Sequence, residues 1–207
     1  MIKLTWEQVH AGRLAQQALQ TRAAKAQLLD IVSRLSGVQA QLMPAAELQL
    51  WARVQDITPL DVQQALWQTR TLVKTWAMRG TLHLVAARDF PLFVAARQAI
   101  TIRRPPSYYT YHGVTPEEAA AILATVPAVL GADGITREQL ADAVAHQANN
   151  PKLREVLLSG WGALLKPSAF QGDLCFGPDQ GSNVTFVRPA QWIGEWTPLE
   201  PQQALGE

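Results

Sequence analysis

The sequence is poor in cysteine and has no long apolar run. Cys175 is the only cysteine among 207 residues, so no internal disulfide can form, and the chain fits a reducing compartment. No apolar segment approaches the roughly 20 residues that a membrane-spanning helix needs. The N-terminal residues also lack the pattern of a secretion signal. We therefore expect a soluble, cytoplasmic protein with no membrane association.

Signatures of metal and nucleotide chemistry are missing as well. The four histidines have no Cys, Asp or Glu partners at the spacings that a metal site needs. There is no Walker loop for nucleotide phosphates and no nucleophile elbow of the serine hydrolases. We therefore expect neither a bound metal nor a cofactor.

The net charge of +1 hides an uneven distribution of charged residues. Residues 70–112 contain seven Lys or Arg and one acidic residue, whereas residues 113–207 contain five and eleven. A basic segment of this kind is typical of a surface that binds a polyanion such as DNA. The alternative is that the basic and acidic segments neutralise each other through ion pairs within the fold.

The same order of structural signals occurs twice along the chain. Short helices lead into a β-hairpin in the first half, and from Thr115-Pro116 the pattern returns and ends in two further strands. This order is typical of winged helix-turn-helix domains. We therefore predict a mainly α fold with small β-hairpins (α+β). It would consist of tandem winged helix-turn-helix domains over residues 1–106 and 107–190, followed by a tail over residues 191–207.

Finer predictions concern individual segments. A helix that begins near residue 44 would place Leu48, Trp51 and Val54 on one apolar side, and Trp51 and Trp76 are predicted to be core residues. In the second half we predict a helix over residues 151–165 and strands over residues 170–176 and 184–188, separated by a loop rich in glycine and proline.

The predicted hairpin at residues 71–85 carries the clearest sign of nucleic-acid binding. Two runs rich in β-branched and aromatic residues meet at Arg79-Gly80, where Gly80 can supply the positive φ of a tight turn. Lys74, Arg79 and His83 lie along these strands and would contact a phosphate backbone. The alternative is an ordinary hairpin whose charges are solvated.

Several strings resemble a known family over most of residues 10–192. They are LSGVQAQ and LWAR (residues 35–41 and 50–53), LVKTWAMRGTLHLVAARDF (72–90), and GDLCFGP and NVTFVR (172–178 and 183–188). They are similar to the bacterial winged-helix DNA-binding family that includes the AlkZ and YcaQ DNA glycosylases. The resemblance implies double-stranded DNA, alkylated or crosslinked, as the partner. Because longer relatives have three such domains, residues 191–207 would be a tail or the start of a third domain that this chain lacks.

The resemblance also implies a catalytic glutamine–hydrophobic–glutamine motif, which falls on Gln39, Ala40 and Gln41. The match is partial, because alanine is a small residue for the middle position. Two residues that lie two apart point to the same side only in an extended segment, and Gly37 can end the preceding helix. An amide is not a strong base, but it can hold a water molecule through hydrogen bonds. Positioned water suffices to remove an alkylated purine, because that leaving group already carries positive charge.

Two functions follow from these observations. The first is a DNA glycosylase that excises alkylated purines, with Gln39 and Gln41 as catalytic residues and with DNA contacts from Lys74, Arg79, His83, Arg53 and Arg70. The second is a non-catalytic winged-helix DNA-binding module or transcriptional regulator, in which the two glutamines satisfy backbone groups. The sequence leaves the preferred lesion and the oligomeric state open.

Overall fold

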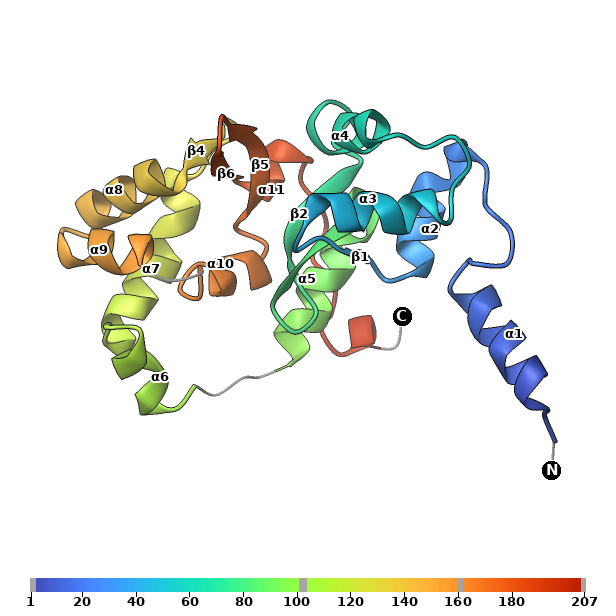
Figure 1. Cartoon of the computed structure of the whole chain (residues 1–207). Coiled ribbons are helices and arrows are strands. Elements are labelled where there is room, and N and C mark those ends of the chain that lie inside the picture. Colours follow the sequence, from blue (N-terminus) through green and yellow to red (C-terminus); the bar gives the residue numbers. More distant parts are fainter. Residues whose placement is uncertain (1–2, 101–103, 160–161, 206–207) are drawn as a thin grey trace. The chain divides into compact units, whose positions relative to one another are not determined.

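The computed structural model describes residues 3–100, 104–159 and 162–205 and is mainly helical, with two small antiparallel sheets (Figure 1). This confirms the predicted mainly α composition with small β elements. The chain divides into two compact units, which comprise residues 1–73 with 81–89 and residues 74–80 with 90–207. This division is based on contacts between residues and not on fold type, so it does not test the predicted domain boundary after residue 106. That boundary stays a prediction. Within the described ranges, no helix has both the length and the apolar character needed to cross a membrane.

The first series of elements ends in a three-stranded sheet with the order β1-β3-β2. Its members are α1 (Trp6–Gln16), a 3-10 turn (Lys25–Gln27), α2 (Leu28–Arg34), β1 (Val38–Gln39), α3 (Met43–Trp51), α4 (Pro59–Trp67), β2 (Leu72–Ala77), β3 (Thr81–Ala86) and a 3-10 turn (Ala87–Asp89). The predicted hairpin is therefore confirmed, and Gly80 adopts a φ of 89° in its turn. The two-residue strand β1 was not predicted from the sequence.

The apolar side of α3 differs from the prediction. Ala46 and Leu50 are fully buried, whereas Leu48 and Trp51 are 63% and 54% exposed. Ala46 and Leu50 lie one helical turn apart, so they define the stripe that faces the core, and Leu48 and Trp51 fall outside it. The predicted core position of Trp51 is therefore wrong, while the burial of Val54 is confirmed.

The second series ends in a sheet with the order β4-β6-β5. Its members are α5 (Phe90–Ala99), α6 (Pro106–Tyr111), α7 (Pro116–Val129), β4 (Ile135–Thr136), α8 (Arg137–Gln147), α9 (Lys152–Leu158), α10 (Lys166–Phe170), β5 (Cys175–Gln180), β6 (Asn183–Val187), α11 (Pro189–Trp192) and a 3-10 turn (Gln203–Leu205). The core of the unit that comprises residues 74–80 and 90–207 includes Trp76 of β2. The Trp76 ring lies 4.8 Å from that of Phe176 and 6.2 Å from that of Phe186. The predicted core position of Trp76 is thus confirmed.

Two segment predictions in this unit are wrong. The helix predicted over residues 151–165 ends at Leu158, because Ser159 adopts an extended backbone conformation; residues 160–161 of that prediction lie outside the described chain. The strand predicted over residues 170–176 starts only at Cys175, because Phe170 ends α10 and Gly172 has a φ of 82°. That strand then continues to Gln180 through an irregular register, where the sequence indicated a loop. The strand predicted over residues 184–188 is confirmed as β6.

The N-terminus of α4 contributes stability that depends on pH. The Asp61 carboxylate accepts a hydrogen bond from the Thr58 backbone at 2.8 Å and lies 2.6 Å from the Lys25 ammonium group. Lys25 and then Thr58 lower the pKa of Asp61 from its ordinary 3.8 to about 2. Because the pKa is lower in the folded state, this contribution is complete above pH 3.8 and is lost as the pH falls towards 2.

We therefore expect Asp61→Asn to flatten the pH dependence of the unfolding free energy between about pH 4 and pH 2. The difference should be about 1 kcal/mol, because solvent screens an ion pair in this partly exposed place. Urea denaturation at a series of pH values measures it. Asp56→Asn is the control, since Asp56 is exposed and makes no ion pair in the described structure. Identical pH dependence in wild type and Asp61→Asn would contradict the prediction.

Candidate functional site

Gln39 is the last residue of β1, Gln41 lies two residues further on in a bend, and both residues are exposed. Val38 and Ala40 alternate with them and are buried, at 1% and 0% exposure. This alternation leaves both glutamines on the solvent side of the chain, away from the buried Val38 and Ala40. Neither side-chain amide forms a hydrogen bond to any other described residue. Both amides are thus available to water or to a ligand.

His83 lies directly opposite Gln39, on the neighbouring strand β3. The Ala40 amide donates a hydrogen bond to the Leu82 carbonyl at 2.7 Å. Because hydrogen-bonded and non-hydrogen-bonded pairs alternate along an antiparallel ladder, Gln39 and His83 form the latter kind, in which facing side chains lie closer. The His83 Nδ1 is 3.0 Å from the Thr81 carbonyl oxygen, which can only accept, so Nδ1 donates. We call Gln39, Gln41 and His83 the glutamine face.

Hydrogen bonds from the side chains of Gln49 and Arg53 link the backbone of Gln39 to α3 and to Gln17. The Gln49 side chain donates to the Gln39 carbonyl at 3.2 Å and to the Ala45 carbonyl at 3.1 Å. Arg53 donates to the Gln49 carbonyl and to the Gln17 carbonyl, each at 2.8 Å. Burial lowers the pKa of Arg53. The guanidinium group of Arg53 therefore ties helix ends together, and the predicted DNA contact of Arg53 stays a prediction.

The cations of the hairpin have different environments. Lys74 is half-buried, with its ammonium group 5.4 Å from the centre of the Phe176 ring. Burial lowers the pKa of Lys74, and the charge of Asp179 opposes this effect. Arg79 is exposed in the turn and has no partner among the described residues. Arg70 is partly buried and precedes β2 with a φ of 54°. Arg79 is therefore the residue of this group best placed to meet a phosphate from solvent.

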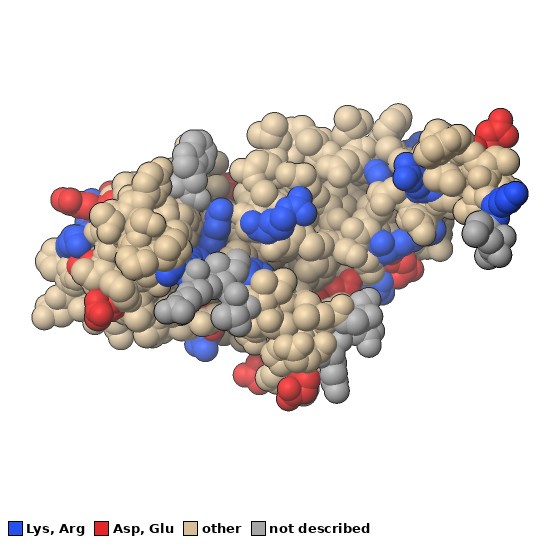
Figure 2. Space-filling model, turned by 90° about the horizontal axis from the view of Figure 1, so that it is seen from below, with Lys and Arg blue, Asp and Glu red and all other residues tan. Residues whose placement is uncertain are grey.

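Figure 2 shows Lys and Arg side chains at several places on the face drawn. One member of the basic segment is also paired, because Arg88 lies 2.6 Å from the Asp30 carboxylate. Within the described part of the chain, no three His, Cys, Asp or Glu residues are grouped in a way that could hold a metal ion.

Comparison with known proteins supports an assignment to a family. The family model for AlkZ-like DNA glycosylases matches residues 32–207. The chain belongs to the AlkZ-like DNA glycosylase family. An interstrand DNA cross-link repair glycosylase from Streptomyces sahachiroi is 35% identical over 205 residues, which are 98% of this chain and 55% of that protein. The solved structure of the DNA glycosylase AlkZ from Streptomyces sahachiroi has a TM-score of 0.85 and 34% identity, with 98% of this chain and 55% of that chain covered.

These findings confirm the resemblance to the AlkZ family that the sequence strings indicated. The chain spans 55% of the length of the curated relative it matches. Sequence reasoning missed Gln49, whose side chain donates to the Gln39 carbonyl. No local signal points to Gln49, because its role depends on how α3 packs beside β1. It also missed β1 itself, although the alternation of apolar and polar residues at 38–41 is a strand signal.

Gly37→Ala is expected to destabilise the unit that carries the glutamine face by about 1–3 kcal/mol. Gly37 has a φ of 92°, and an added Cβ would lie 3.2 Å from both the Leu84 carbonyl oxygen and the Val85 side chain. Urea denaturation measures the effect. Gly12→Ala is the matched control: Gly12 lies in α1 with no atom within 4 Å of the added Cβ, so this change should be neutral or stabilising. Equal stability of the two variants would contradict the expectation.

Proposed function

We propose that this chain acts as a DNA glycosylase that removes alkylated purine bases from double-stranded DNA. The observation that carries the proposal is the glutamine face, in which Gln39 and Gln41 are both exposed and Gln39 lies opposite His83. Membership of the AlkZ-like family supports this role.

In the proposed reaction, water attacks the anomeric carbon of the damaged nucleotide while the N-glycosidic bond breaks. The bonding electrons pass to the purine, whose positive charge from alkylation they neutralise, so the base leaves without a proton donor. The attacking water releases its proton to solvent, and the products are the free base and an abasic site. Gln39 and Gln41 orient the water, since each amide can both donate and accept a hydrogen bond.

We also propose that the two series of elements are tandem winged helix-turn-helix domains. In the first, α2, β1, α3 and α4 precede the β2–β3 hairpin. In the second, α7, β4, α8 and α9 precede the β5–β6 hairpin, after the short helix α10. Both sheets place the isolated short strand next to the second strand of the hairpin. This repeated order supports the prediction of domains at residues 1–106 and 107–190.

Contacts with the DNA backbone are proposed first for Arg79 and His83. Arg79 is exposed and has no partner among the described residues, and His83 lies opposite Gln39. Lys74, Arg53 and Arg70 remain predicted contacts of lower weight, since the first two already have other partners. The relative from Streptomyces sahachiroi is described as acting on interstrand cross-links. We propose N7-alkylated purines, including crosslinked ones, as the substrate class of this chain.

The test is release of the base from duplex DNA that contains a single N7-methylguanine. The wild-type chain, in excess over the duplex, should release the base with first-order kinetics and leave an abasic site that alkali cleaves. Binding of the duplex without any release would instead identify a non-catalytic DNA-binding module. Absence of both binding and release would reject the DNA-directed function altogether.

A further inference from the structure

A cleft of about 370 Å³ in the second unit is lined, among the described residues, by two arginines and by no acidic residue. Arg97 lies in the last turn of α5, and Arg104 lies just before α6. Tyr109 of α6 lines the same cleft. The remaining walls come mostly from α7 and α10 and carry no charge. The cleft therefore has a positive lining with no anion built into it.

Aromatic rings, and not carboxylates, hold the two guanidinium groups. The centre of the Arg97 guanidinium lies 4.1 Å from the centre of the Phe170 ring, and that of Arg104 lies 4.2 Å from the Tyr108 ring. Arg104 also donates to the Tyr108 hydroxyl, and Arg97 donates to the Ile100 carbonyl at 3.1 Å. The Nε of Arg97 is buried and has no hydrogen-bond partner among the described residues. Stacking on a ring face leaves the donors at the edge of a guanidinium group available to a ligand.

The positive charge of Arg104 acts on the guanidinium group of Arg97. Burial, and after it the positive charge of Arg104, lowers the pKa of Arg97. The ion pairs of the described chain include neither Arg97 nor Arg104. Two like charges held close together repel, and an anion between them would convert this repulsion into attraction.

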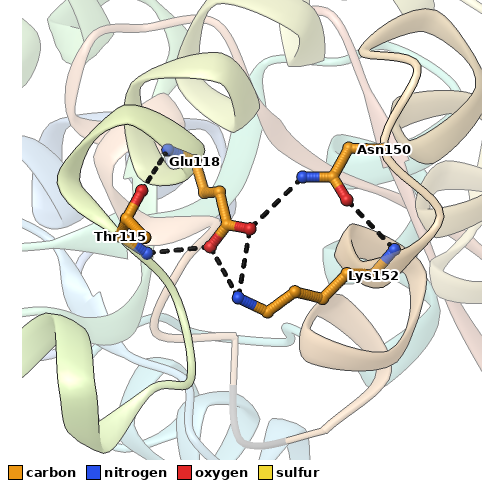
Figure 3. Close-up of polar contacts among 4 residues, drawn as sticks. All are labelled: Thr115, Glu118, Asn150 and Lys152. Atoms are coloured by element: carbon orange, nitrogen blue, oxygen red, sulfur yellow. Dashed lines mark hydrogen bonds and ion pairs between the residues drawn. The ribbon is translucent and has the colours of Figure 1, made fainter.

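Glu118 in the first turn of α7, a helix that reaches the cleft through Pro116, does not supply that anion. Figure 3 shows the Glu118 carboxylate directed at Lys152 and Asn150. Its Oε2 lies 2.8 Å from the Lys152 ammonium group and accepts from the Thr115 backbone at 2.8 Å. The Glu118 carboxylate is therefore paired with Lys152 at the start of α9. Among the described residues, Arg97 and Arg104 have no acidic partner.

We propose that Arg97, Arg104 and Tyr109 form a phosphate-binding site that holds one phosphodiester of the DNA backbone. Planar guanidinium groups donate in pairs to phosphate oxygens, and the Tyr109 hydroxyl adds a further donor. The assignment of DNA as the source of the phosphate rests on the proposed glycosylase function. Free phosphate has the same recognition chemistry, so the experiment must separate the two sources.

The test is duplex affinity, measured by fluorescence anisotropy from about 50 to 200 mM salt, for the wild type and three variants. Arg97→Gln and Arg104→Gln should each weaken binding roughly tenfold and reduce the slope of log affinity against log salt by about 1. Arg154→Gln is the matched control, because its guanidinium group is already paired with Asp142 at 2.5 Å and Glu138 at 2.8 Å. This control should leave affinity and slope unchanged.

Arg97 contributes packing as well as charge, so circular dichroism melting accompanies each measurement. If Arg97→Gln fails to fold, Arg104→Gln and Arg97→Lys carry the test. Arg97→Lys should keep the salt slope but lose affinity, since lysine retains the charge without the planar fork. Unchanged affinity and slope in folded Arg104→Gln would overturn the proposal.

A second arm uses inorganic phosphate at millimolar concentration and follows the melting temperature. If phosphate stabilises the wild type but not Arg104→Gln, while duplex binding is the same in both, the site takes free phosphate and the DNA assignment is overturned. If the wild type binds duplex and releases the base but neither variant differs from it, the site alone is rejected. If the wild type does neither, the proposed glycosylase function fails, and the DNA assignment fails with it.

Discussion

Gln41→Ala is expected to slow the release of N7-methylguanine from duplex DNA by about 100-fold or more. The same variant should bind the duplex within about twofold of wild type. The Gln41 side chain is exposed and makes no hydrogen bond within the described chain, so its removal disturbs no internal contact. What is lost is the orientation of water, which acts on the chemical step and not on affinity. Single-turnover excision and fluorescence anisotropy measure the two quantities separately.

The matched control is Gln147→Ala, which removes an exposed glutamine at the end of α8. It should leave both rate and affinity unchanged. Gln39→Ala should behave as Gln41→Ala does, because the two amides face the same side. An excision rate for Gln41→Ala equal to that of wild type would remove the catalytic role, and the glutamine face would then serve binding alone.

Leu50→Ala should lower the unfolding free energy by about 2–5 kcal/mol. Leu50 is fully buried and holds α3 in the core of the unit that carries the glutamine face. Truncation removes buried apolar surface and leaves a cavity that the surrounding side chains fill only in part. Urea denaturation followed by circular dichroism gives the change in stability.

Leu48→Ala provides the comparison on the same helix. Leu48 is 63% exposed, so its truncation should change stability by no more than about 0.5 kcal/mol. A cost for Leu48→Ala as large as that for Leu50→Ala would show that the assigned core face of α3 is wrong. The sequence alone favoured Leu48 as a core residue, so this pair of variants also tests the correction made above.

The local features of the site could be read from the sequence. Gly37 and Gly80 mark positions of positive φ at either end of the sheet, and the structure has φ values of 92° and 89° there. After Gly37, exposed Gln39 and Gln41 alternate with buried Val38 and Ala40, although Gln41 lies in a bend beyond β1. These features depend on a few neighbouring residues, whose steric preferences act without any help from distant parts of the chain.

Tertiary structure decided which distant residues meet these local features. The pairing of β1 with β3 sets His83 opposite Gln39, and the packing of α3 brings the Gln49 amide to the Gln39 carbonyl. Sequence reasoning predicted DNA contacts for Arg53 and Lys74. In the structure, Arg53 donates hydrogen bonds to two backbone carbonyls, and the ammonium group of Lys74 lies over the Phe176 ring.

The sequence strings thus indicated the family that the comparisons confirm, and local patterns indicated the two hairpins. The sequence left open whether the two glutamines are exposed or satisfy backbone groups. Only the tertiary structure decided which cations form hydrogen bonds within the protein. Arg53 donates to backbone carbonyls, whereas Arg79 has no hydrogen-bond partner among the described residues. The reason is that a charged side chain can also donate to a carbonyl or stack on a ring inside the fold. The choice depends on what the fold places within reach, and that is a property of segments far apart in sequence.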